Sequence, residues 1–183
     1  GLGDVYKRQS LEGTHHLACV RGATWRWKQL NFSVLWPLSS PNKGENNDSC
    51  VVSVDDGNVR LLLTGDLEKL AEQQLVRLEK QQLKADILQV PHHGSRTSSS
   101  RLLLRSVAGH TAIASLARYN AWRMPAKPVL RNYHEYGYNW LDTGQSGQIS
   151  IRVGKGKMQV FTLREQLMPR WYHQWFGVKR ESR

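Results

Sequence analysis

The sequence has few cysteines and no long apolar run, and both absences exclude whole classes of protein. Its 183 residues include two cysteines, Cys19 and Cys50, which are too few for a disulfide framework and do not form a CxxC metal motif. We expect both to pack as small apolar side chains. No segment reaches the roughly 18 to 20 uninterrupted apolar residues of a membrane-spanning helix, and the start lacks the layout of a secretory signal. A soluble domain is expected.

Acidic residues are scarce in the second half of the chain. Residues 1–95 hold 11 basic and 11 acidic residues, whereas residues 96–183 hold 15 and 4, so the whole surplus of +11 lies after position 95. Such an imbalance indicates a polyanion nearby, either nucleic acid or a phosphate-rich membrane face. An ordinary solvated surface is the alternative.

Hydrophobic periodicity predicts one α/β domain without internal repeats. Alternating apolar residues predict two antiparallel strands between Thr24 and Trp36, and a turn at 55–58 predicts a second hairpin. Further strands are predicted at 50–54, 59–63, 85–90 and 111–116, and around 138–141, 148–153 and 158–163. Helices are predicted from Asp66 to about residue 80, near 102–107 and over 127–136. Strands alternating with helices are typical of an α/β layer.

Two groups of apolar residues are predicted to be buried. In the helix after Asp66, an apolar face is opposed by a polar face that includes Glu72. That apolar face consists of Leu67, Leu70, Ala71, Leu75 and Leu78. Trp25, Trp27, Trp36 and Trp140 are expected to pack in the core or on the sheet.

Reactive side chains follow two predicted strands. The run LLLTGD ends in Asp66, and the run ILQVPHHGS places His92 and His93 after the next strand. Because a crossover helix separates these strands, they should lie parallel and end at one edge of the sheet, where α/β folds place their sites. The alternatives are a helix N-cap for Asp66 and a polar loop for the histidines.

Carboxylate and imidazole ligands suit zinc, manganese or iron, and a carboxylate can bridge two metal ions. A paired-metal phosphoesterase fits this chemistry. Gly94 would let a substrate approach the backbone, while Ser95 and the run 98–100 would supply hydroxyl donors or a helix cap. A paired-metal centre needs roughly five to seven ligands, more than Asp66 and His93 provide.

A basic and aromatic loop lies beside this predicted edge. It contains Arg118, Tyr119, Trp122 and Arg123. Alternating cations and rings suit the phosphates and bases of a single nucleic-acid strand, and a solvated loop is the alternative.

Several motifs in this order resemble one family. These are NNDSCVVSVDDG, TGD at 64–66, VPHHGS at 90–95, AIASLARYN at 112–120 and the later TGQSGQI. Together they resemble the C-terminal metallo-β-lactamase-like domain of the ComEC family of competence proteins, the DNA-internalisation channels of bacterial inner membranes. The closing RWYHQWFGV resembles the version found in enteric-type proteobacteria.

The resemblance implies roles for individual residues. Asp66 would bridge two divalent ions, zinc or manganese, His93 would be a terminal ligand, and His92 would face the substrate as a catalytic imidazole. Asn47 and Ser49 would contact substrate phosphate in place of a metal-binding histidine, and Gly94, Ser95, Arg118 and Asn120 would also bind substrate. The His-Pro pair that often follows the family's Asn is Met124-Pro125 here.

The resemblance also implies a fold and a function. The fold class is α/β, the later part of an αββα metallo-β-lactamase-like sandwich with mixed sheets and outer helices. Residues 18–165 would form this domain, 1–17 are unassigned and possibly a non-native leader, and 166–183 form an aromatic and basic tail. The family's HxHxDH cluster would lie upstream, so we expect a fragment that binds metal weakly or not at all and is inactive alone.

The complete domain would be a metal-dependent phosphodiesterase or nuclease that degrades the DNA strand that is not imported. Its partners would be single-stranded DNA and the membrane channel of the same inner-membrane protein, with the domain on the periplasmic face. The alternative is a non-catalytic DNA-binding or structural domain of the channel.

Overall fold

A seven-stranded mixed sheet organises the computed structural model, which describes residues 17–40, 44–154, 157–170 and 172. The strands lie in sequence order across the sheet, antiparallel from β1 to β4 and parallel from β4 to β7. They are β1 (Thr24–Trp27), β2 (Leu30–Trp36), β3 (Val51–Asp55), β4 (Arg60–Leu63), β5 (Ile87–Gln89), β6 (Thr111–Ala114) and β7 (Asn139–Asp142). The predicted α/β class is confirmed.

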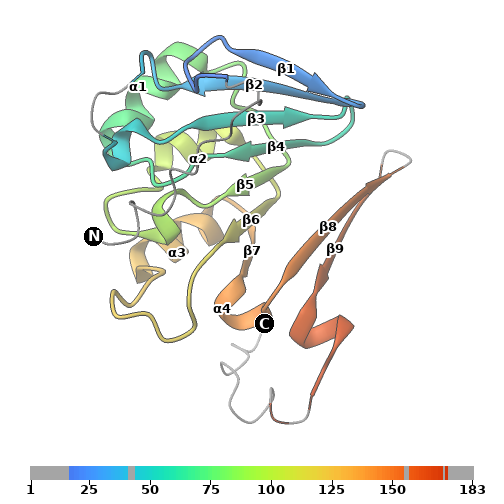
Figure 1. The fold of residues 1–183 in the computed structure, drawn as a ribbon. Coiled ribbons are helices and arrows are strands. Elements are labelled where there is room, and N and C mark those ends of the chain that lie inside the picture. The colour runs from blue at the N-terminus through green and yellow to red at the C-terminus, as the bar shows by residue number, and fades with distance from the viewer. Residues whose placement is uncertain (1–16, 41–43, 155–156, 171, 173–183) are drawn as a thin grey trace, which may run out of the picture.

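Three helices lie along one side of this sheet (Figure 1). They are α1 (Lys69–Glu79), α2 (Arg101–Val107) and α3 (Lys127–Glu135). The core lies between them and the sheet, where Leu62, Leu88 and Ala112 of neighbouring strands are fully buried together with Leu75 of α1 and Leu104 of α2. The order strand, helix, strand around β4, α1 and β5 makes β4 and β5 parallel, as predicted.

The chain after β7 forms a separate hairpin. A short helix, α4 (Thr143–Ser146), leads into β8 (Ile149–Gly154) and β9 (Lys157–Thr162), which pair with each other. A single wide turn, η3 (Leu163–Leu167), follows. Figure 1 shows this hairpin beyond β7, away from the three helices. The sequence predicts both strands within a residue or two but neither α4 nor η3, and most of the predicted tail lies outside the described residues.

Of the four tryptophans predicted to pack in the core or on the sheet, two lie outside the core. Trp36 is buried and Trp140 packs against the core, but Trp25 is 40% exposed and Trp27 is 60% exposed. Both lie on β1, the edge strand, whose four residues are all exposed. Trp25 instead stacks on Phe32 of β2, with ring centroids 4.8 Å apart.

The predicted polar face of α1 is in fact partly buried. Glu72 is fully buried, whereas Leu70 and Leu78, assigned to the apolar face, are exposed. Burial of Glu72 is possible because its two carboxylate oxygens accept hydrogen bonds from the Ser99 and Ser100 amides, at 2.6 and 2.7 Å. Desolvation raises the pKa of Glu72 above its ordinary value, and these hydrogen bonds oppose that shift.

The expectation that Cys19 and Cys50 pack as small apolar side chains is also wrong, because they form a disulfide with their Cα atoms 5.9 Å apart. The segment before β1 folds back on the end of β2, where the Arg21 amide donates to the Pro37 carbonyl and the Gly22 amide to that of Val34. This return places Cys19 beside Cys50, just before β3.

Within the part of the chain that the structure describes, no helix is long and apolar enough to cross a membrane.

Candidate functional site

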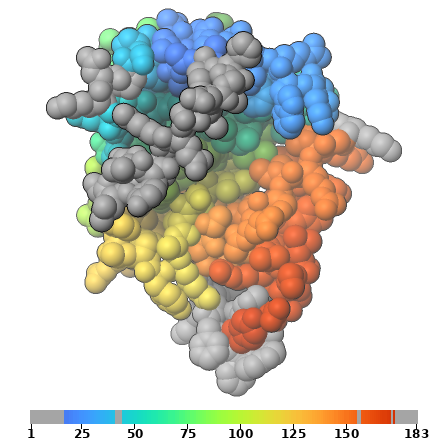
Figure 2. Space-filling model, viewed as in Figure 1, coloured from blue at the N-terminus to red at the C-terminus, as the bar shows by residue number. Residues whose placement is uncertain are grey.

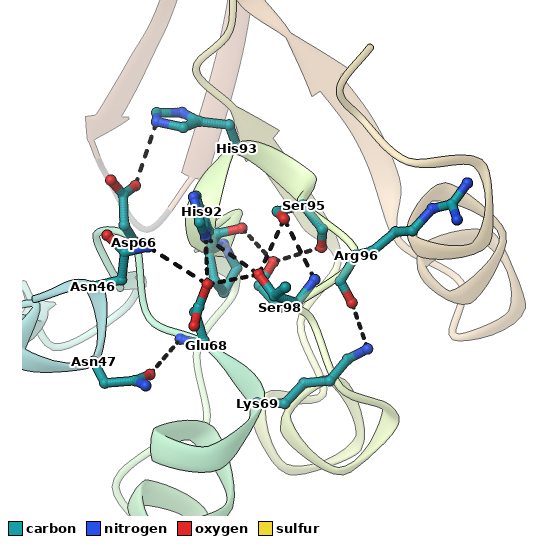
Figure 3. Close-up of polar contacts among 12 residues, drawn as sticks. Asn46, Asn47, Asp66, Glu68, Lys69, His92, His93, Ser95, Arg96 and Ser98 are labelled. Atoms are coloured by element: carbon teal, nitrogen blue, oxygen red, sulfur yellow. Dashed lines mark hydrogen bonds and ion pairs between the residues drawn. The ribbon is translucent and has the colours of Figure 1, made fainter. Parts of the chain in front are cut away.

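Asp66 and the histidine pair meet at one edge of the sheet. Asp66 lies three residues beyond β4, and His92 and His93 lie in η2 (Pro91–Gly94), just after β5. The His93 Nε2 atom is 3.4 Å from the Asp66 carboxylate, and both side chains are 43% exposed. Figure 3 shows the two side chains pointing toward each other. The predicted convergence is confirmed.

The histidines occupy strained backbone. His92 has φ 46° and ψ 44°, and His93 has φ 54° and ψ 18°, a left-handed conformation that costs about 1 to 3 kcal/mol for a residue other than glycine. Gly94 follows at φ 80°, and a Cβ atom there would come within 2.9 Å of the Pro125 Cβ. Such strain is typical of functional turns and here directs both imidazoles out from the sheet edge.

His93 is held in the orientation of a metal ligand. Its Nδ1 lies 2.5 Å from the Ser115 carbonyl oxygen, and since a carbonyl can only accept, Nδ1 carries the proton. The Nε2 atom then faces Asp66. An imidazole that donates from one nitrogen to a carbonyl and offers the other is the usual arrangement of a metal-binding histidine.

Asp66 is fixed through its backbone by Ser49. The Asp66 amide donates to the Ser49 Oγ at 2.9 Å, and a Cβ atom at Gly65 would come within 2.9 Å of the Ser49 Cβ. The alternative that Asp66 caps a helix is wrong, because α1 begins at Lys69 and its N-cap is Glu68. The Asp66 carboxylate therefore faces His93 and the surface.

His92 has partners that the sequence did not indicate. Its Nδ1 lies 3.2 Å from the Glu68 carboxylate, and Thr97 donates to the same carboxylate at 2.8 Å. The hydrogen bond from Thr97 lowers the pKa of Glu68, and Asn46 and His92 add to this effect. Glu68 is thus a stable anion that orients His92 (Figure 3). Glu68 lies two residues after Asp66, so its position next to the TGD motif was the signal in the sequence that could have indicated it. Thr97 comes from another loop, to which that signal does not extend.

The other predicted substrate contacts surround this edge, and their roles stay predictions. Asn47 accepts a hydrogen bond from the Glu68 amide at 3.1 Å, and the Ser95 Oγ lies 3.1 Å from the Thr97 hydroxyl. Gly94 is buried against Pro125. In the serine run, Ser100 caps α2 by accepting from the Leu103 amide, which confirms the helix-cap expectation for that run.

The predicted basic and aromatic loop follows β6, the strand next to β5. Tyr119 and Trp122 are 85% and 77% exposed, and the Arg118 guanidinium lies 5.5 Å from the Tyr119 ring centre. Asn120 bonds the loop's own backbone, donating to the Ala117 and Met124 carbonyls and accepting from the Met124 amide. Its side chain therefore shapes the loop, and contact with substrate stays a prediction for Asn120 and Arg118.

The pair Asp66 and His93 fits a divalent metal, with an anionic oxygen and an oriented imidazole nitrogen on one open edge. Among the described residues, no group of three or more His, Cys, Asp or Glu side chains could hold a metal ion. Asp66 and His93 alone are fewer ligands than a metal centre needs.

A family model described as the metallo-beta-lactamase superfamily matches residues 15–118. The chain is 51% identical over 174 residues to a protein named Uncharacterized protein YcaI from Escherichia coli (strain K12), covering 95% of this chain and 23% of that protein. It is 35% identical to Recombination protein 2 of Haemophilus influenzae, covering 95% of this chain and 22% of the relative. It is also 35% identical to Competence protein ComA of Neisseria gonorrhoeae, over 88% and 23% of the two chains.

The chain spans less than a quarter of the length of these curated relatives.

Proposed function

Because the chain belongs to the metallo-β-lactamase superfamily, we propose that it is the metal-dependent phosphodiesterase or nuclease part of a DNA-uptake protein, acting on the strand that is not imported. One observation carries this proposal. Asp66 and His93 lie 3.4 Å apart at the carboxyl edge of parallel strands. Beside them is the His92 imidazole, which is oriented by Glu68 and not by either of them. Relatives named for competence and recombination support DNA as the substrate.

Each of the residues present would have a separate role in such a site. Asp66 would bridge two divalent ions, zinc or manganese, and His93 would hold one of them, with further ligands from sequence upstream of this chain. Divalent ions bound there would supply activation of water and neutralisation of phosphate charge. His92, oriented by Glu68, would meet a substrate oxygen and hold or give a proton there. Asn47, Ser49 and Ser95 would line the phosphate site.

The named relatives and the disulfide support a location for the domain. The whole protein would be an inner-membrane DNA channel, and this domain would lie on its periplasmic face. Disulfides persist in oxidising compartments, which include the bacterial periplasm. The Cys19–Cys50 bond therefore supports that face.

A non-catalytic DNA-binding domain is the second candidate. It is favoured by the absence, among the described residues, of a cluster of three or more metal-ligating side chains. The basic surplus after residue 95 fits either candidate.

The test uses the longer natural protein that includes the upstream sequence. With single-stranded DNA as substrate, Asp66→Asn should abolish hydrolysis and lower the metal content, because an amide lacks the two anionic oxygens that a bridging ligand needs. His93→Ala should nearly abolish both. His92→Ala should lower turnover about 100-fold or more and keep the metal.

His110→Ala is the control, since His110 is an exposed histidine just before β6. It should change neither metal content nor hydrolysis. Full activity and full metal content in the Asp66→Asn protein would contradict the assignment. A wild-type protein that binds DNA but holds no metal would support the second candidate.

A further inference from the structure

A cavity of about 360 Å³ opens directly beside His93. One part of its wall is apolar and comes from the loop after β6. The other part is polar and includes the His93 imidazole, so the cavity adjoins the candidate metal edge. The lining includes His93, Leu116, Asn120, Trp122, Met124 and Thr143.

The wall of this cavity is braced from two sides. The Asn120 amide makes three hydrogen bonds to the backbone of Ala117 and Met124. The Thr143 hydroxyl accepts from the Leu116 amide and donates to the Leu116 carbonyl, both at 2.9 Å. Figure 2 shows the loop (yellow) beside the segment from β7 to α4 (orange) on one face. These hydrogen bonds fix the wall of the cavity, and small-molecule sites are usually pre-formed in this way.

The loop that lines the cavity carries two exposed aromatic rings and an exposed cation, Arg123. Trp122 lines the cavity and is 77% exposed, and Tyr119 nearby is 85% exposed. A large aromatic ring that is exposed to solvent at the mouth of a cavity indicates a binding site more strongly than an exposed aliphatic residue does. From Arg96 to His134 the sequence holds seven Lys or Arg residues and no Asp or Glu. The stretch of chain that contains the cavity loop is thus rich in cations, which favours a partner that carries phosphate.

We propose that this cavity binds one unpaired nucleobase of a single-stranded DNA, stacked on Trp122. A nucleobase has apolar faces and polar edges, which match the mixed wall, and its phosphates would lie toward Arg123 on one side and the His93 edge on the other. A base in a duplex is paired and stacked, so the cavity would select an unpaired strand. This inference rests on the proposed function in that it names how the same edge recognises its substrate.

The test measures binding of the 183-residue chain by fluorescence anisotropy, with a chelator present and at low salt. The probes are a labelled mixed-sequence single strand, an abasic strand of the same length, and the corresponding duplex. The two single strands carry the same phosphates, so their difference isolates the bases. We expect the single strand to bind about tenfold more tightly than the abasic strand, the scale of one stacked base.

Trp122→Ala should remove this difference and leave abasic binding unchanged, while Trp122→Phe should retain most of it. Trp27→Ala is the matched control, because Trp27 is also exposed, at 60%. It lies on β1, at the opposite end of the sheet from β7, which leads to the cavity residue Thr143. Thermal melting of each variant should show an unchanged fold.

Equal affinity of the wild-type chain for the normal and abasic strands would overturn the proposal, as would a Trp122→Ala protein that keeps the difference. Absence of DNA binding altogether would overturn it too and would leave the cavity to another class of partner. Because no metal or hydrolysis is involved, these outcomes are separate from those of the proposed function. A longer protein without hydrolysis could still show the base-dependent binding.

Discussion

The two adjacent imidazoles of this site are held by different parts of the chain. His93 is anchored by the Ser115 carbonyl at the end of β6, and His92 by Glu68 and Thr97. Their ring planes are inclined by 68° with centroids 6.3 Å apart. In the proposed site, these separate supports would let His93 bind metal while His92 meets substrate.

Glu68 is predicted to act through His92 and not through metal. In the longer natural protein, Glu68→Gln should lower kcat on single-stranded DNA about tenfold, because an amide orients the imidazole less strongly than a carboxylate does. Metal content and KM should stay close to wild type. Steady-state kinetics and elemental analysis check both quantities.

Glu165→Gln is a suitable control for that change, since Glu165 is an exposed glutamate of η3. It should leave kcat unchanged. A Glu68→Gln protein that loses metal in proportion to activity would contradict the positioning role and make Glu68 part of the metal centre.

At the scale of elements, Glu72 connects α1 to the loop before α2. Its two oxygens accept from the Ser99 and Ser100 amides, and Ser99 has a left-handed backbone with φ 57°. Glu72→Gln should lower the free energy of unfolding by about 1 to 3 kcal/mol, because an amide nitrogen cannot accept from the second N–H and leaves it unsatisfied.

Urea unfolding measures this loss. Glu135→Gln is the matched control, because Glu135 is exposed at the end of α3 and pairs with Arg101, and exposed ion pairs contribute about 1 kcal/mol or less. Equal stability of the two variants would mean that the buried hydrogen bonds of Glu72 contribute little.

The Cys19–Cys50 disulfide closes a loop of 31 residues that contains β1 and β2. Loop-closure entropy predicts that the bond contributes about 3 to 4 kcal/mol to stability. Reduction of the wild-type chain and the double substitution Cys19→Ser, Cys50→Ser should therefore lower the urea midpoint by the same amount. If reduction leaves the midpoint unchanged, or if the chain holds two free thiols after purification under oxidising conditions, the prediction is wrong.

The sequence predicted elements whose causes are local and missed those that depend on distant partners. The turn at 55–58, the strand before Asp66 and the strand before His92 are local patterns, and their parallel order placed Asp66 beside His93. Burial of Glu72 depends on the amides of Ser99 and Ser100, 27 and 28 residues away. The cysteine pair likewise depends on the return of residues 19–22 to the end of β2, which periodicity does not describe.

At the scale of the whole molecule, the arginines near the candidate site differ in whether their charge is paired. Arg96 and Arg123 are exposed, whereas Arg101 is paired with Glu135 at 2.8 Å. Arg101 is thus partly neutralised. Arg96 lies two residues after the histidine turn and Arg123 lies within the cavity loop, so the exposed cations border both parts of the candidate site.

The chain should therefore bind single-stranded DNA without sequence preference and release it as salt rises. Four phosphate contacts would give a slope of log affinity against log salt of about −3, which is about a 50-fold loss between 50 and 200 mM salt.

The double substitution Arg96→Ala, Arg123→Ala should weaken binding at 50 mM salt and make the slope shallower by about 1.4. Arg77→Ala with Lys80→Ala, which removes two exposed cations from α1 and the residue after it, should change the slope much less. Anisotropy titrations at four salt concentrations measure both slopes. Equal slopes for the two double variants would show that the charge surplus acts as a diffuse field, and salt-independent affinity would show that it is an ordinary solvated surface.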